Sequence, residues 1–253
     1  MQDFLSAAPQ LKPSYDNPIF SSYGLLLDLY KAGKIDSKYL FRSDVINKIK
    51  NNPLVELASH TFSHYYALEE GQTIDQFETD IFTAKQEAAK AGIDFNSIIF
   101  PRNQIPAEYR IVCAKNGFSH IRGNEESFLY CSESSRSLFG YKRFFRLLDC
   151  YFNITGHHTY KDPPKNELCD VLASRFFYPY RKTLRFLEPL KMKRIKDDIH
   201  YAAKHNEIYH LWWHPHNFGV NTQENIKQLE VICKYFIEMR DKYGMQSWFM
   251  NQF

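Results

Sequence analysis

The feature that most constrains the fold is an alternation of short apolar runs with amphipathic segments in the first half of the chain. Residues 55–59 and 97–100 are predicted strands, and the segment between them carries apolar residues at helical spacing after a capping box that begins at Thr73. A second predicted helix begins at Pro106 and ends before Gly117. Strands separated by helices of this length are typical of parallel βα units. The sequence therefore predicts an α/β fold.

The rest of the chain continues this pattern less regularly. Further strands are predicted at residues 118–123, 207–213 and 247–250, with a strand end within 173–180. Further helices are predicted at residues 22–32, 43–51, 141–154, 191–205 and 222–243. Residues 1–22, 124–138 and 155–172 are predicted to be irregular.

Polar residues follow two of the predicted strands, and each set contains a histidine pair. His60 and His64 follow the strand at 55–59, and His214 and His216 follow a later strand. Active sites of α/β proteins lie at the carboxyl ends of strands, so we expect the two pairs to lie near one another. Neutral imidazole is a frequent ligand of zinc and similar divalent metals.

The spacing of His60 and His64 brings both rings to one side if the segment forms a helical turn. Thr61 and Ser63 can hydrogen-bond backbone groups and hold a tight loop. A catalytic metal typically has about three protein ligands, so a third ligand, expected to be a carboxylate, is needed. The alternative is an ordinary histidine pair at the surface or half buried, because the pattern His-x-x-x-His alone has low specificity.

Here the sequence resembles the polysaccharide deacetylases, carbohydrate esterases that include chitooligosaccharide and peptidoglycan deacetylases. HTFSH at residues 60–64 is similar to the His-[Ser/Thr]-x-x-His metal motif of that family. FPRNQ at 100–104 and LWWHPHNFG at 211–219 fall, in the same order, where the family has its arginine motif and its late leucine-and-histidine motif. The amino-acid sequences of these two segments resemble those of a bacterial subgroup often associated with surface-polysaccharide genes. The resemblance runs from about Asp44 to the C-terminus.

The resemblance implies a metal-dependent hydrolase that removes N-acetyl groups from a polysaccharide or sugar conjugate in bacterial surface polysaccharide metabolism. His60 and His64 would be the metal ligands, and the expected divalent metal is zinc. The general acid would be His214 or His216. We favour His214, because it directly follows the predicted strand.

Other residues are expected to contact the carbohydrate substrate. Arg102 would orient the catalytic carboxylate or bind substrate, or else it is a loop arginine held by a salt bridge, and Asn103 beside it would bind substrate. Strand alternation points one of Trp212 and Trp213 toward the acetyl group and leaves the other in the core. Arg175 either faces the site and binds substrate or forms an ion pair at the surface.

One departure from the family concerns its first motif. The family begins with a strand ending in [Ser/Thr]-Phe-Asp-[Asp/Glu], whose aspartates supply the catalytic base and the third metal ligand, and no such motif precedes His60. We therefore expect one polysaccharide-deacetylase-like domain over residues 1–253, truncated at its N-terminus, with an irregular lead at 1–42 and the core of the resemblance at 43–253. The expected fold is a distorted, incomplete (β/α) barrel of the polysaccharide deacetylase type, whose exposed sheet edges favour self-association.

The missing motif also leaves a second function open. The alternative to an active deacetylase is a catalytically impaired remnant, or a sugar-binding pseudoenzyme of the same fold. A small-amide hydrolase on the same scaffold is a third interpretation.

Composition bears on partners and location. The net charge of +3 comes without a clustered basic stripe, so the sequence does not indicate nucleic-acid binding. The five cysteines are scattered and form no Cys-x-x-Cys pair, which predicts reduced thiols and a cytoplasmic location. No apolar run approaches the ~20 residues that span a membrane. The first residues lack the basic segment of a signal peptide.

Overall fold

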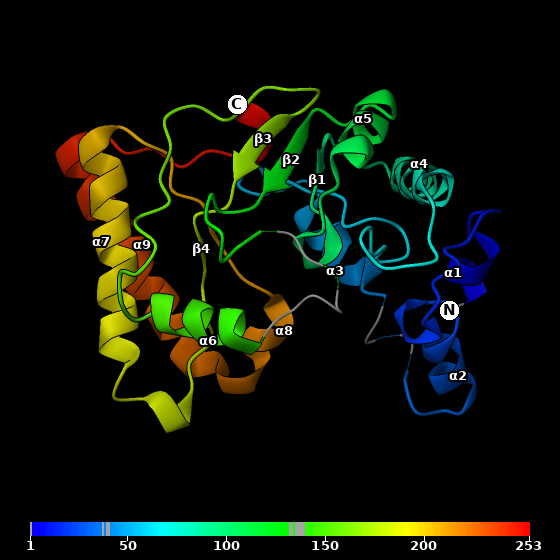
Figure 1. Ribbon diagram of the computed structural model, residues 1–253, viewed down its shortest axis with the longest axis horizontal. Helices are drawn as coiled ribbons and strands as arrows, with labels where there is room; N and C mark the ends of the chain where they lie inside the picture. Colours follow the sequence, from blue (N-terminus) through cyan, green and yellow to red (C-terminus); the bar gives the residue numbers. More distant parts are fainter. Residues whose placement is uncertain (1, 37, 39–40, 132–133, 135–139) are drawn as a thin grey trace.

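The computed structural model describes the chain except for residues 1, 37, 39–40, 132–133 and 135–139. Two short parallel sheets lie at the centre, and helices surround them (Figure 1). The fold is therefore mixed α/β, which confirms the prediction at this level. Within the described residues the strands form no closed barrel.

The first sheet holds three parallel strands in sequence order. They are β1 (Ser97–Ile98), β2 (His120–Gly123) and β3 (Cys169–Leu172). β1 and β2 confirm the strands predicted at 97–100 and 118–123, although both are shorter than predicted. A single parallel bridge between Ser59 and Ile98 extends this sheet beyond β1.

β3 lies where the sequence predicted irregular chain, within residues 155–172. Asp170 interrupts the apolar run of this strand and conceals its pattern. The structure accommodates the carboxylate by pairing it with Arg110, whose Nη2 lies 2.5 Å from Asp170 Oδ2. The prediction for these residues is therefore wrong at its C-terminal end.

The second sheet adjoins the first. It consists of β4 (Arg175–Phe176) and β5 (Leu211–Trp212), which pair in parallel. The Ala173 N–H donates to Gly123 O at 2.9 Å, and the Ser174 N–H donates to His210 O at 2.9 Å. One continuous stretch of chain therefore joins β2 on one side to the β5 region on the other.

Two predicted strands are absent or reduced. Residues 55–58 form no strand, because Val55 donates its N–H to Asn52 O in a turn and only Ser59 reaches β1. The strand predicted at 247–250 is wrong. The chain there enters the 3-10 helix η6 (Met250–Gln252), and the Gln252 side chain accepts the Phe249 N–H at 2.7 Å.

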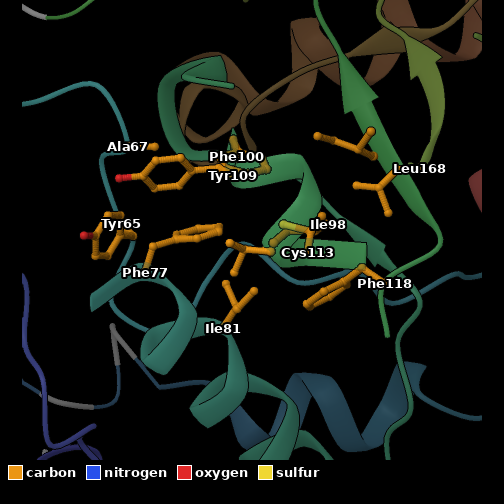
Figure 2. Packing of buried hydrophobic residues seen from close by; sticks show 12 residues of the cluster. Tyr65, Ala67, Phe77, Ile81, Ile98, Phe100, Tyr109, Cys113, Phe118 and Leu168 are labelled. Atoms are coloured by element: carbon orange, nitrogen blue, oxygen red, sulfur yellow. The ribbon is translucent and has the colours of Figure 1, made fainter. Parts of the chain in front are cut away.

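The larger apolar core lies between the first sheet and two helices, α4 (Ile74–Lys90) and α5 (Ala107–Lys115). The predicted capping box is confirmed, because Thr73 and Gln76 exchange side-chain and backbone hydrogen bonds. Figure 2 shows Phe77 of α4 among the rings and aliphatic side chains of this core. Its ring centroid lies 4.7 Å from that of Tyr109 and 5.3 Å from that of Phe100. Burying one such ring contributes about 1.5–3 kcal/mol.

A second apolar core lies at the other end of the molecule, under α7 (Glu188–His205) and α9 (Thr222–Tyr243) (Figure 1). Its fully buried members include Phe177 and Ile195. α9 begins and ends at the predicted residues, and Gly244 ends it with a φ of 74° in the left-handed region that favours glycine. α7 begins before the predicted residue 191.

Shorter helices complete the chain. They are α1 (Gln2–Ser6), η1 (Pro18–Phe20), α2 (Leu25–Lys31), α3 (Ser43–Ile49), η3 (Pro101–Asn103), α6 (Gly140–Asp149), η4 (Lys182–Leu184), α8 (Pro215–Phe218) and η5 (Gly219–Asn221). The lead predicted to be irregular at 1–42 thus contains helices. It also packs against the rest of the chain, because the Phe4 ring stacks on Phe62 at a centroid distance of 5.1 Å.

None of the described helices has the length and apolar character needed to cross a bilayer.

Candidate functional site

The first part of the site is the histidine loop, residues 60–64, which begins where Ser59 leaves the sheet. The Ser59 N–H donates to Ser97 O, and Ser59 O accepts the Ile99 N–H, both at 2.9 Å. Thr61 and His64 have positive φ angles of 65° and 59°. The segment is therefore a tight loop and not a helical turn. The sheet bridge and the loop reversal bring the two histidines together.

Asp80 of α4 accepts hydrogen bonds from the backbone of this loop. Its Oδ1 accepts the Phe62 N–H at 2.8 Å, and its Oδ2 accepts the Ser63 N–H at 3.0 Å. The Thr61 hydroxyl oxygen accepts the Tyr65 N–H at 2.7 Å, as predicted for a tight loop. Burial raises the pKa of Asp80 to about 6, while the two N–H groups lower it.

Sequence reasoning missed Asp80, although a signal was present. Asp80 is 0% exposed and lies on the same face of α4 as Phe77, Ile81 and Ala84. A charged residue on a predicted apolar helix face needs a buried hydrogen-bond partner. Here the partner is the backbone of the histidine loop.

The two histidine rings form a close pair. The ring centroids of His60 and His64 lie 4.9 Å apart, with the planes at 76°. His60 Nδ1 lies 2.8 Å from the carbonyl oxygen of Ile99. A carbonyl oxygen only accepts, so Nδ1 carries the proton and the lone pair is on Nε2. Metal-binding histidines are commonly oriented by such a bond from the other ring nitrogen.

The pKa values of both histidines are lowered, which favours their neutral forms. Partial burial of the rings lowers both pKa values, that of His60 to about 4, although each residue keeps exposed surface. For His60 the neighbouring His64, Arg122 and His214 act in the same direction. For His64, Arg102 and His214 do so. The neutral form is the one that binds a metal.

His214 faces the histidine loop from the second sheet. It precedes α8, with Pro215 at the first helical position. Its ring centroid lies 5.4 Å from Trp212, 5.6 Å from Phe176 and 5.2 Å from His216. Its charge lowers the pKa of both His60 and His64, so the predicted meeting of the two strand ends is supported by electrostatic proximity. Burial and then His216 lower the pKa of His214 itself.

Arg102 lies beside His64, in η3. Its Nη1 lies 3.5 Å from Glu69 Oε1, and its guanidinium lies over the Tyr66 ring at 4.4 Å from the centroid. These contacts are those of a loop arginine held by a salt bridge, which was the alternative considered for Arg102 from the sequence. Its charge also lowers the pKa of His64, so it borders the site. Asn103, the next residue, directs its side-chain oxygen to Arg122 Nη2 at 2.6 Å.

Arg122 and Glu125 are site residues that sequence reasoning missed. Arg122 lies in β2 with its guanidinium 4.2 Å from the centroid of the Trp212 ring. Trp212 Nε1 donates to Glu125 Oε1 at 3.4 Å. Both charged residues are buried, at 8% and 5% exposure. Glu125 follows the predicted strand at 118–123, so the rule that led to His60 and Arg102 would also have led to it. Arg122 lies within that strand, so the rule does not find it.

The other predicted site residues point elsewhere. The Trp213 ring stacks on Phe218, at a centroid distance of 5.3 Å, and belongs to the second core. Strand alternation thus separates it from Trp212 as predicted. Arg175 is 3% exposed, with Nε 2.6 Å from Asp198 Oδ2 and Nη1 3.2 Å from Asp149 Oδ2. The surface ion pair considered for Arg175 is wrong because both partners are buried. Its substrate-binding role stays a prediction.

The described residues supply part of a metal site. His60 and His64 offer neutral imidazoles, but no group of three histidine, cysteine, aspartate or glutamate side chains is placed to hold an ion in the part of the chain described. The predicted third ligand is therefore not found there. Two cavities of about 770 and 820 Å³ lie elsewhere, one beside Tyr209 and Trp248 and one between α4 and α5. Neither is lined by the site histidines, so the chemistry of the side chains, not cavity size, identifies the site.

Comparison of the chain with known protein families, with curated proteins and with solved structures found no match. The function must therefore be inferred from the site.

Proposed function

We propose that the protein is a metal-dependent hydrolase that removes N-acetyl groups from a polysaccharide or sugar conjugate. The observation that carries this proposal is the pairing of His60 and His64, with the Ile99 carbonyl fixing the tautomer of His60. Two imidazoles with ring centroids 4.9 Å apart suit a divalent metal, with zinc the expected ion. The resemblance of HTFSH, FPRNQ and LWWHPHNFG to polysaccharide deacetylase motifs supports the same chemistry.

His60 and His64 would hold the metal, which when bound lowers the pKa of water and polarises the amide carbonyl. Hydrolysis adds a water oxygen to the acetyl carbon and breaks the carbon–nitrogen bond. The departing amine needs a proton, and His214 would donate it. Trp212 and Phe176, with ring centroids 4.6 Å apart, would form an apolar wall for the acetyl group.

We also propose that the two sheets form one arc of an incomplete, distorted (β/α) barrel. Ser59, β1, β2, the β3–β4 stretch and β5 follow one another in sequence order, and all pairings along this path are parallel. The hydrogen bond from Ser174 to His210 continues the path between the two sheets. In such an arc the carboxyl ends of the strands face one side, where His60, Arg102 and His214 are.

The test measures bound metal and acetate release on the same protein. Wild-type chain incubated with zinc and then desalted is expected to retain the metal and to release acetate from N-acetylated chitooligosaccharides. His60→Ala should lose both. His205→Ala is the matched control, because His205 is exposed at the end of α7 and bonds only Tyr201 O among described partners. Absence of bound zinc from the wild type would contradict the proposal.

A second candidate is a sugar-binding protein of the same fold without turnover. It is favoured by the absence of a three-ligand group from the described residues and by the absence of the family's aspartate motif before His60. This candidate predicts saturable sugar binding without acetate release, in both the wild type and His60→Ala. Acetate release that depends on His60 excludes it.

A further inference from the structure

Three arginines are buried in the described part of the chain, and their partners differ. Arg175 and Arg194 each form an ion pair with the carboxylate of Asp198. Arg122 is 8% exposed and has no ion-pair partner among the described residues. Its Nε is buried and lacks any hydrogen-bond partner there. A buried guanidinium without a counter-charge is costly, so such a group is retained where it binds something.

The surroundings of Arg122 satisfy it only in part. Its Nη2 donates to Asn103 Oδ1 at 2.6 Å, and one face of the guanidinium lies over the Trp212 ring. The acidic group whose charge acts on Arg122 is Glu125, which accepts a hydrogen bond from Trp212 Nε1 at 3.4 Å and forms no ion pair with Arg122 among the described residues. Burial raises the pKa of Glu125, while the Arg122 charge lowers it. Burial also lowers the pKa of Arg122 to about 10, since its cation is poorly compensated.

Arg122 belongs to the same site as the histidines. The Trp212 ring that its guanidinium covers at 4.2 Å also contacts His214, at a centroid distance of 5.4 Å. On its other contact, Nη2 bonds Asn103, the residue after Arg102. The cation therefore lies between Asn103 and the aromatic ring that contacts His214.

We propose that Arg122 binds the carboxylate of an acidic sugar, a uronic acid residue, with the sugar ring placed against the aromatic wall formed by Trp212 and Phe176. The planar edge of a guanidinium matches a planar carboxylate through paired N–H···O bonds. Aromatic rings offer apolar surface with specific geometry to the faces of a sugar. The choice of a sugar rests on the proposed function, whereas the choice of an anion rests on Arg122 alone. The substrate class is thus an N-acetylated, uronate-containing saccharide.

The experiment compares two sugars that differ only at C6, by calorimetric titration without metal. They are 2-acetamido-2-deoxy-D-glucuronic acid, which carries a carboxylate, and N-acetyl-D-glucosamine, which carries a hydroxymethyl group. Wild type should bind the acid roughly 10–100-fold more tightly, the range expected for a charged hydrogen-bonded pair. Arg122→Met should bind both sugars with equal affinity. Arg122→Lys should keep part of the preference, because lysine retains the positive charge but lacks the planar guanidinium with its several N–H donors.

The control is Arg240→Met, which removes one positive charge from an exposed site on α9, where Arg240 pairs with Asp241. It should keep the wild-type preference, which separates a local contact from the overall charge. Equal affinity of the wild type for the two sugars, or binding of neither, overturns the proposal. A preference that survives in Arg122→Met overturns it as well. Tighter binding of N-acetylglucosamine 6-phosphate than of the acid would mean that the site prefers a phosphate to a carboxylate. That result also overturns the proposal.

Failure of this proposal and failure of the proposed function give different results. A preference for the acid that depends on Arg122, without acetate release from any sugar, rejects the hydrolase and keeps the anion site. Acetate release that depends on His60 but is equal for neutral and acidic oligosaccharides rejects the anion site and keeps the hydrolase.

Discussion

Two buried arginines, one in each sheet, show how differently two regions of the molecule treat charge. Arg175 of β4 pairs with both Asp149 and Asp198, and its pKa is raised because those carboxylates outweigh the cost of burial. Arg122 of β2 has no carboxylate partner among the described residues, and its pKa falls to about 10. The same side chain is thus fully compensated in one region and left partly unsatisfied in the other.

The difference separates a group that supports the fold from a group available to a ligand. Around Arg175 the charges form a closed network, in which Tyr130 and Thr155 donate to Asp149 and His157 bonds Asp198. A ligand there would have to displace existing partners. Around Arg122 a ligand would supply a missing one. Burial and charge alone do not distinguish these two cases, whereas an ion pair with a buried carboxylate does.

The largest expected effect is on the stability of the Arg175 network. Arg175→Met leaves the carboxylates of Asp149 and Asp198 buried with fewer counter-charges. Removing one partner of a buried pair costs about 3–5 kcal/mol. Urea unfolding followed by fluorescence should show a loss of that size in the free energy of unfolding. If the free energy of unfolding falls by less than about 1 kcal/mol, Arg175 contributes as little to stability as is expected of Arg122. The contrast between the two regions would then disappear.

The next effect concerns His158, which lies beside the Arg175 network. Burial and then Arg175 lower its pKa to about 4, from an ordinary value near 6.5. The unfolded chain therefore takes up a proton below pH 6.5 that the folded chain takes up only near pH 4. The stabilisation is complete above pH 6.5 and is lost as the pH falls through 4, by at most about 3 kcal/mol. His158→Asn should remove this part of the pH dependence of urea unfolding, and Asn tolerates the positive φ of 51° at this position.

Asp80, under the histidine loop, should show the opposite sign. Burial raises its pKa to about 6, so between pH 4 and 6 the folded chain keeps a proton that the unfolded chain loses. Its contribution is complete below about pH 3.8 and falls as the pH rises through 6, by at most about 3 kcal/mol. Asp80→Asn should flatten that slope in the same urea experiment. If the wild type and Asp80→Asn have parallel pH profiles, the buried carboxylate does not titrate in this range.

The fold was predictable where the pattern is local and long. The capping box at Thr73, the boundaries of α9 and the strand at 118–123 follow from propensity and hydrophobic periodicity. Strands that depend on distant pairing were not. The segment at 247–250 has strand composition but forms no strand, and η6 begins at its last residue, Met250. β3 carries Asp170, whose partner Arg110 is far away in the sequence.

The candidate site was predictable where one rule applied, that polar residues after a strand gather at one edge. That rule led to His60, Arg102 and His214. It could not provide the loop conformation, which depends on positive φ angles and on Asp80 of α4. It also could not show that Arg175 is paired and Arg122 is not, because ion pairing depends on which distant carboxylates fold beside each arginine.

The smallest expected effect is the one that most sharply tests the contrast. Arg122→Met removes a buried charge that has no ion-pair partner among the described residues, together with one hydrogen bond to Asn103. The lost bond costs about 1 kcal/mol, and relief of the unpaired cation offsets it, so the free energy of unfolding should change by less than about 1 kcal/mol. The measurement is urea unfolding of the ligand-free protein beside Arg175→Met. Adding the acidic sugar should stabilise the wild type more than it stabilises Arg122→Met, because only the wild type gains a partner for the guanidinium. If Arg122→Met lowers the free energy of unfolding as much as Arg175→Met does, Arg122 supports the fold. The two arginines would then differ in their location and not in their role.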